Sequence, residues 1–178
     1  LVLIASLTAE AKVTLPAIFS DNMVLQQNTQ VNVWGKAAPG EKVKVKASWL
    51  DKAVTAKAAA NGKWTVKLKT PKATTNQSVT VSGENEITIN NVLIGEVWLC
   101  TGQSNMEFPV SRHPDVKWNT GMLNEAEELK DADYPEIRLF HVKHQLAHEG
   151  ELDDCEGEWL VCNPKNLYDF SAVGFVFG

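Results

Sequence analysis

A serine that follows an apolar run is the clearest candidate for chemistry in this sequence. Residues 92–100 are almost continuously apolar, as expected of a strand covered on both faces, and Thr101-Gly102-Gln103-Ser104-Asn105-Met106 comes next. In α/β sheets, reacting groups collect where the strands end. A serine hydroxyl there can act as a nucleophile once a base activates it, and a glycine two residues earlier permits a tight turn.

The residues around Ser104 suggest roles but leave an alternative open. Met106 stands where the Gly-x-Ser-x-Gly elbow of α/β-hydrolases has its second glycine, so this is not that motif. We expect Ser104 to be the nucleophile, with Gly102, Gln103 and Asn105 lining or supporting the site. A serine after a strand is commonly a cap or turn residue, and Gln103 and Asn105 could equally be turn-formers.

The histidines and acidic residues offer other chemistries that we weigh against this one. His113 is close to Ser104 in sequence, but Ser–His partners are defined by geometry in space. His141, His144 and His148 would suit zinc only in a helix, and His141 falls in a predicted strand. The acidic run 149–158 lacks the ligand spacing of a calcium loop. We therefore predict no metal or cofactor, and a solvated acidic loop at 149–158.

Short alternating strands and turn signals fill residues 13–92. Trp64, Val66 and Leu68 point one way while the polar residues between them point the other, and the same alternation recurs at 43–49 and 79–89. Asn61-Gly62 is the strongest hairpin signal, because type I′ turns need positive φ at both central positions. The pattern predicts an antiparallel β-sandwich of about 80 residues, placed at 12–93.

The character of the chain changes after Asn91. The buried strand at 92–100 is followed by a helix predicted over 121–130 with Thr120 as its cap, and then by a second buried strand at 137–142. Another apolar element, possibly helical, occupies 170–177. Strand, helix, strand, helix is the opening of an α/β domain, which we place at 94–178 and expect to be incomplete.

Charge and aromatic residues bear on the class of partner. The net charge is −5, yet residues 1–72 hold 11 basic against 4 acidic side chains. Lys42, Lys44 and Lys46 alternate with valines, which indicates the solvated face of a strand, and no nucleic-acid-binding motif accompanies them. Trp34, Trp49 and Trp64 could stack on sugars, but their positions favour a role in the core.

The amino terminus and the cysteines bear on cellular location. Residues 1–7 form an apolar run, and Ala9-Glu10-Ala11 follows as a small-x-small pattern. Residues 1–11 are therefore typical of the tail of a secretory signal peptide, with a first β-strand as the alternative. We expect a secreted or periplasmic protein without a membrane span. Cys155 and Cys162 could pair in an oxidising compartment, whereas Cys100 is expected to be buried.

The stretch around Ser104 resembles a known family. Residues 92–108, VLIGEVWLCTGQSNMEF, closely resemble the sialate O-acetylesterase family, whose catalytic domain is an SGNH-type hydrolase. The upstream LPAIFSDNMVLQQ, VWG, APGEKV and NGKW are similar to the N-terminal β-domain of that family, and the closing FSAVGFVFG follows in the family's order. The resemblance covers nearly all of the chain after Ala11.

The resemblance implies a fold and a mechanism. The fold would be a β-sandwich followed by the start of a flavodoxin-like α/β domain. Ser104 would attack an acetyl ester on sialic acid or a related glycan, form an acyl-enzyme, and supply one oxyanion donor through its backbone N–H. The family's other oxyanion donors and its Asp-x-x-His pair lie in later motifs, none of which occurs before Gly178.

Two expectations about this fragment follow from the resemblance. We expect the chain alone to be inactive, because the base that would activate Ser104 belongs to the missing Asp-x-x-His pair. The alternative function is a glycan-binding β-sandwich with a non-catalytic remnant. The sequence indicates nothing about oligomeric state.

Overall fold

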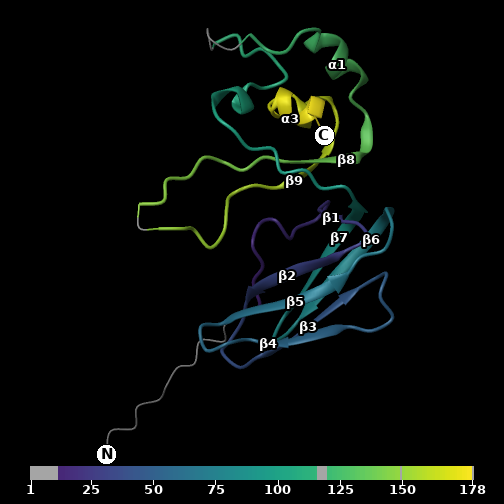
Figure 1. Ribbon diagram of the computed structural model, residues 1–178, viewed down its shortest axis with the longest axis vertical. Helices are drawn as coiled ribbons and strands as arrows, with labels where there is room; N and C mark the ends of the chain where they lie inside the picture. Colours follow the sequence, from purple (N-terminus) through teal and green to yellow (C-terminus); the bar gives the residue numbers. More distant parts are fainter. Residues whose placement is uncertain (1–11, 116–119, 149, 178) are drawn as a thin grey trace, which may run out of the picture.

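The first half of the chain is built of β-strands. The computed structural model describes residues 12–115, 120–148 and 150–177, so the predicted signal-peptide remnant at 1–11 lies outside the described residues. Seven strands precede residue 96 (Figure 1): Val24–Gln26 (β1), Gln30–Lys36 (β2), Lys42–Ala47 (β3), Val54–Lys57 (β4), Lys63–Lys69 (β5), Thr74–Ser82 (β6) and Glu86–Gly95 (β7).

These strands form two sheets. The larger sheet has the order β1-β7-β6-β3-β4, and the smaller one pairs β2 with β5. All pairings are antiparallel except β1 with β7, in which Val24 lies beside Leu93. Thr14 forms an isolated bridge to Lys36 at the free edge of β2. The expected sandwich is therefore mostly antiparallel, with one parallel pair.

The apolar face of each strand packs into one core. Trp64, Val66 and Leu68 of β5 are buried, as the alternation predicts, and they meet buried residues of the larger sheet such as Val45 and Val81. Burying side chains of this size supplies about 1.5–3 kcal/mol each. The strand pattern thus accounts for how this half folds.

Two expectations for the β half are wrong in detail. Asn61-Gly62 does not close a hairpin between paired strands; it leads from β4 in the larger sheet to β5 in the smaller one, and only Gly62 has positive φ. Trp34 is not a core residue but is 40% exposed, because it lies on the outer face of β2 opposite Thr65. Trp64 is buried and Trp49 partly buried, as expected.

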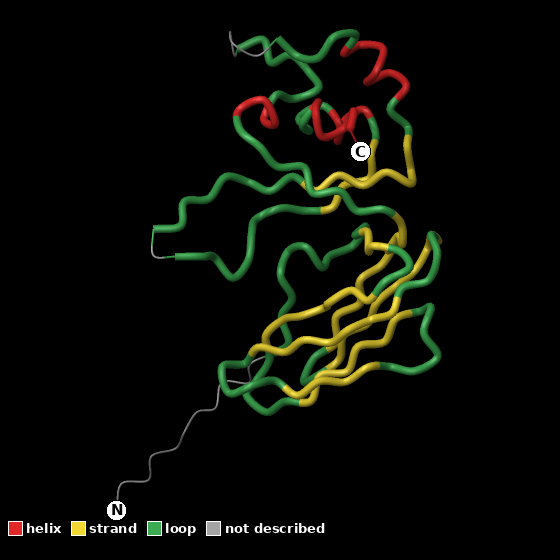
Figure 2. Tube along the Cα trace, viewed as in Figure 1, coloured by secondary structure: helices red, strands yellow, loops and turns green. Residues whose placement is uncertain are grey.

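The second half has less regular structure (Figure 2). Two strands pair antiparallel in a separate sheet, and the helices are short. The elements are Ser104–Glu107 (η1), Glu125–Asp131 (α1), Tyr134–Phe140 (β8), Trp159–Cys162 (β9), Pro164–Leu167 (α2) and Ala172–Phe177 (α3). A second core of buried residues joins them: Val110, Ala132, Leu139, Cys162 and Leu167.

The strands of the second half differ from the sequence prediction. The apolar run 92–100 is a strand only as far as Gly95; beyond it Trp98 and Leu99 are 58% and 88% exposed. The expected strand 137–142 is β8, which begins and ends earlier and includes Pro135. β7 and β8 lie in different sheets, so the described residues do not form the expected parallel strand–helix–strand unit.

The helix predicted over 121–130 begins four residues late. Gly121 and Asn124 adopt positive φ, which ends any helix there, and Asn124 rather than Thr120 precedes α1. Leu123, expected on the buried side, is 87% exposed. The apolar element expected at 170–177 is partly helical, as α3.

The described residues of the acidic loop are mostly exposed, as expected, and the loop also contacts the first half of the chain. Asp153 pairs with Lys36 of β2 and Lys63 of β5, and Asp154 accepts hydrogen bonds from the Ala17 N–H. The indole N–H of Trp159 donates to the Ile18 carbonyl at 2.8 Å. An acidic residue of the second half, Asp153, is therefore held against lysines in two strands of the first half.

Candidate functional site

Ser104 lies at the start of a single helical turn that the solvent reaches. It is the first residue of η1, and the side chains of residues 101–105 are all exposed. Within the part of the chain that the structure describes, the Ser104 hydroxyl has no hydrogen-bond partner. N–H groups at the start of a helix have no intrahelical acceptor, so the backbone here can also donate to a ligand.

The neighbouring residues make this turn possible. The Met106 N–H donates to the Gln103 carbonyl at 2.8 Å, which closes the turn. Gly102 lies under the Met106 side chain: a Cβ atom at Gly102 would lie 2.7 Å from Met106 Cγ. A larger residue at 102 would therefore displace Met106. Asn105 and Gln103 remain exposed on either side of Ser104, and no side-chain cap is made by Gln103.

The chain beyond η1 is fixed to the end of the described sequence. The Val110 N–H donates to the Phe170 carbonyl at 2.9 Å, and the Ala172 N–H donates to the Phe108 carbonyl at 2.8 Å. Pro109 and Ser171 form the bridge between these segments. Two segments with separate resemblances to the family, around Ser104 and around Phe170, thus lie side by side.

The chain before η1 is fixed to β1. The side-chain amides of Gln26 and Gln27 donate to the two oxygens of Glu96 at 2.8 and 2.7 Å, and the Val97 N–H donates to Gln26 Oε1. The Gln26 and then the Gln27 hydrogen bonds lower the pKa of Glu96. Sequence reasoning did not identify this cluster, although the apolar LPAIFSDNMVLQQ segment ends in the two glutamines that make it.

Two histidines near this region pair with carboxylates. His113 Nε2 lies 2.8 Å from Asp169 Oδ1, and His144 Nε2 lies 3.0 Å from Glu107 Oε1 at the end of η1. Neither histidine hydrogen-bonds to Ser104 in the residues that the structure covers. The geometry therefore does not bring His113 to the serine as its base.

Two of the cysteines are poor competitors as nucleophiles. All three are free thiols; Cys162 is buried in the second core and Cys100 only half-buried, against expectation. Burial raises the pKa of Cys162, and burial together with the Asp154 charge raises that of Cys155. A raised pKa keeps a thiol protonated and unreactive. The structure gives no pairing of Cys155 with Cys162.

Neither a cluster of metal-binding side chains nor a helix able to span a membrane is found among the described residues. Outside 1–11, 116–119, 149 and 178, no three histidine, cysteine or acidic side chains gather as a metal site would require. His141, His144 and His148 lie beyond β8 in an exposed segment without helix. Among the described helices, none combines the length and apolar character that crossing a bilayer requires.

A well-defined cavity of the described structure lies away from the serine turn. It has a volume of about 330 Å³ and lies between residues 14–16, β2, β5 and the acidic loop. Ser104, Gln103 and Asn105 do not line it. The residues of the serine turn are exposed to solvent.

Known proteins with similar sequences share one name. A sialate O-acetylesterase of Mus musculus is 36% identical over 101 residues, which is 52% of this chain and 17% of that protein. Those of Rattus norvegicus and Homo sapiens are 34% and 32% identical, over 100 and 101 residues, again 52% of this chain and 17% of each relative. No protein-family model matches the chain.

A solved structure extends the similarity over almost the whole chain. A carbohydrate acetylesterase from Xanthomonas citri superimposes with a TM-score of 0.80 at 32% identity, covering 93% of this chain and 36% of that one. These similarities support a relationship of the chain to the sialate O-acetylesterases. It spans 17% of the length of the curated relatives that it matches. The mostly β fold of the chain is similar to the part of that carbohydrate acetylesterase that it matches.

Proposed function

We propose that the protein is a serine esterase that removes O-acetyl groups from sialic acid or a related acetylated glycan, with Ser104 as nucleophile. The observation that carries the proposal is the position of Ser104. It is an exposed hydroxyl at the start of a one-turn helix, in a chain similar to proteins named for acetylesterase activity. Gly102, Gln103 and Asn105 would line or support the site.

The proposed reaction has two steps. The Ser104 oxygen bonds to the acetyl carbonyl carbon while a base takes the hydroxyl proton; the C–O bond to the sugar then breaks, and the sugar oxygen receives that proton. Water repeats the sequence on the acyl-enzyme and releases acetate. The Ser104 N–H would stabilise the oxyanion, and one such donor lowers the barrier by about 3 kcal/mol.

The base is the part of the mechanism that the described residues do not supply. His113 and His144 are held by Asp169 and Glu107, and the 178 residues contain no Asp-x-x-His sequence. A serine hydroxyl without a base is a weak nucleophile at neutral pH. We therefore propose that the chain by itself releases acetate far more slowly than the Xanthomonas citri enzyme measured beside it.

The proposal is tested in the gene product that contains this chain. Ser104→Ala is expected to lower acetate release from O-acetylated sialic acid at least about a thousandfold, as loss of a nucleophile does. Thr101→Ala is the matched control, because it removes an exposed hydroxyl from the same loop. Equal loss in both variants, or activity retained by Ser104→Ala, would refute the role of Ser104.

Domain organisation and location are also proposals. We propose a β-sandwich domain at 12–93 and the start of an SGNH-type α/β domain at 94–178; the two separate cores support this division. We propose a secreted or periplasmic location, supported by the sequence of residues 1–11. N-terminal sequencing of the exported protein would locate the cleavage site, and a mature protein that retains residues 1–11 would contradict it.

A further inference from the structure

The cavity beside β2 and β5 is lined by both aromatic and charged side chains. Its volume of about 330 Å³ is within the range of small-molecule sites. Trp34 is 40% exposed at its edge, and Phe19 packs against it in a T-shaped contact with ring centroids 4.6 Å apart. An exposed tryptophan held in one orientation by a second ring offers a flat apolar surface at low entropic cost.

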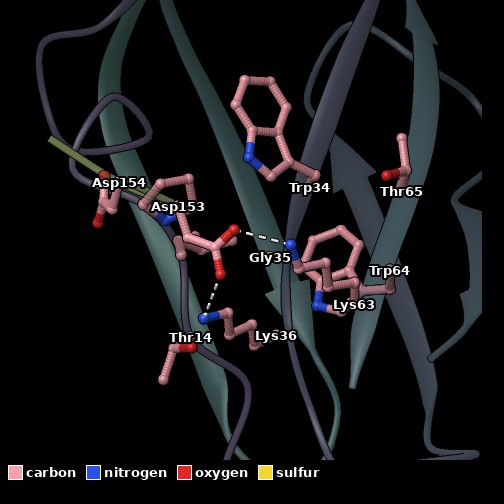
Figure 3. A pocket seen from close by; sticks show the side chains of 11 residues that line it. Thr14, Trp34, Gly35, Lys36, Lys63, Trp64, Thr65, Asp153 and Asp154 are labelled. Carbon is pink, nitrogen blue, oxygen red and sulfur yellow. Dashed lines mark hydrogen bonds and ion pairs between the residues drawn. The ribbon is translucent and has the colours of Figure 1, made fainter. Parts of the chain in front are cut away.

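The polar side of the cavity is formed by charged side chains that hold one another in place. Asp153 lies between two lysines, 3.0 Å from Lys36 Nζ and 2.7 Å from Lys63 Nζ, as Figure 3 shows together with the Trp34 ring. The Lys63 and Lys36 hydrogen bonds lower the pKa of Asp153, so the group is ionised at neutral pH. A carboxylate has about four acceptor sites, so these two bonds leave capacity for a ligand.

The wall of the cavity also contains an unused donor. Trp64 lines the cavity and is 2% exposed, and its indole N–H has no acceptor among the described residues. A buried N–H without a partner costs free energy, and this nitrogen is covered by neighbouring atoms in the described structure. Gly35, between the two tryptophans in the lining, cannot be larger, because its Cβ would lie 2.2 Å from the Thr14 carbonyl oxygen.

The charges indicate which ligand fits. Two lysines and two aspartates line the cavity, so its formal charge is zero. An anion would meet the aspartates and a cation would meet the lysines, whereas hydroxyl groups can donate to one and accept from the other. A sugar ring combines such hydroxyls with an apolar face that matches an indole.

We propose that this cavity binds a neutral sugar residue of an oligosaccharide. Trp34 would carry the apolar face of the sugar, and Asp153 and Lys63 would bind its hydroxyls. The cavity shares no lining residue with the serine turn, so this site is separate from the proposed esterase site and does not rest on it. A sugar bound in this cavity would hold its glycan chain against β2 and β5.

The test is isothermal titration of the 178-residue chain with cellotetraose, xylotetraose, chitotetraose and lactose, none of which carries an O-acetyl group. At least one is expected to bind, and Trp34→Ala is expected to weaken binding about tenfold. Lys63→Met should also weaken it, whereas Lys67→Met, which removes an exposed lysine of the same strand outside this cavity, should not.

Three results would overturn the proposal: no binding of any of these sugars at millimolar concentration, binding retained by both Trp34→Ala and Lys63→Met, or binding lost in Ser104→Ala. If Trp34→Ala does not fold, the comparison of Lys63→Met with Lys67→Met decides the question. Because no acetyl ester is present, failure here leaves the esterase proposal untouched, and failure of the acetate assay leaves this one untouched.

Discussion

The two halves of the molecule differ in how much apolar surface they leave exposed to solvent. In the β layers Leu68 is completely buried, while in the serine-bearing half Leu99 is 88% exposed and Phe177 is 69% exposed. The β layers therefore derive their stability from their own core, whereas the serine-bearing half keeps much apolar surface in contact with solvent. The proposed chemistry is located in the second kind of structure, on loops that a more stable scaffold positions.

The largest expected effect separates the two halves directly. Leu68→Ala should lower the free energy of unfolding by about 2–5 kcal/mol, because it leaves a cavity in the core. Leu99→Ala should change it by less than about 0.5 kcal/mol, because an exposed side chain loses few contacts. Urea unfolding followed by tryptophan fluorescence measures both. Similar losses would show that the second half depends on its apolar residues as the first does.

A glycine pair provides an intermediate effect. Gly62 and Gly150 both have positive φ, but a Cβ at Gly62 would lie 2.8 Å from the Ala37 carbonyl oxygen, whereas Gly150 has no atom within 4 Å. Gly62→Ala should cost about 1–3 kcal/mol, and Gly150→Ala should cost less because its loop can relax. Thermal unfolding of both variants compares them, and an equal shift would contradict this contrast.

The smallest effect concerns the contact between the halves. The pKa of Asp153 is lower in the folded chain than in the unfolded one, so its stabilising contribution is present above the unfolded value of about 3.9 and is lost as the pH falls through the folded value. Hydrogen exchange in residues 150–159 should therefore rise in acid below pH about 4. Asp153→Asn should show the faster exchange already at neutral pH; unchanged exchange would mean that Asp153 does not fix the loop.

The sequence predicts the strands of the β half well, because apolar and polar residues alternate along a strand that has one buried face. Trp64, Val66 and Leu68 are buried as expected. The alternation does not show which sheet a strand belongs to. It therefore gives no sign that Asn61-Gly62 joins β4 and β5, which lie in different sheets. The expectation for Trp34 is wrong for a different reason: the alternation in β2 itself places Trp34 at the outer position between Val33 and Gly35, against the usual preference of tryptophan for the core.

The second half is predicted poorly, because an apolar run does not reveal what covers it. Trp98 and Leu99 continue the run of β7 in composition, yet they are exposed. Turns at Gly121 and Asn124 override the helical pattern at 121–130. Ser104 can be proposed as the nucleophile from its motif, but the carboxylates that hold His113 and His144 lie far away in sequence and follow no recognisable spacing.

Mass spectrometry of the gene product after reaction with a fluorophosphonate probe tests the central claim most directly. The hydroxyl of Ser104 is exposed and without a hydrogen-bond partner in the described structure, and its activation would make it the most reactive serine. We predict a single adduct on the peptide that contains Ser104 and none after Ser104→Ala. An adduct on another serine, or none at all in protein that releases acetate, would contradict the account.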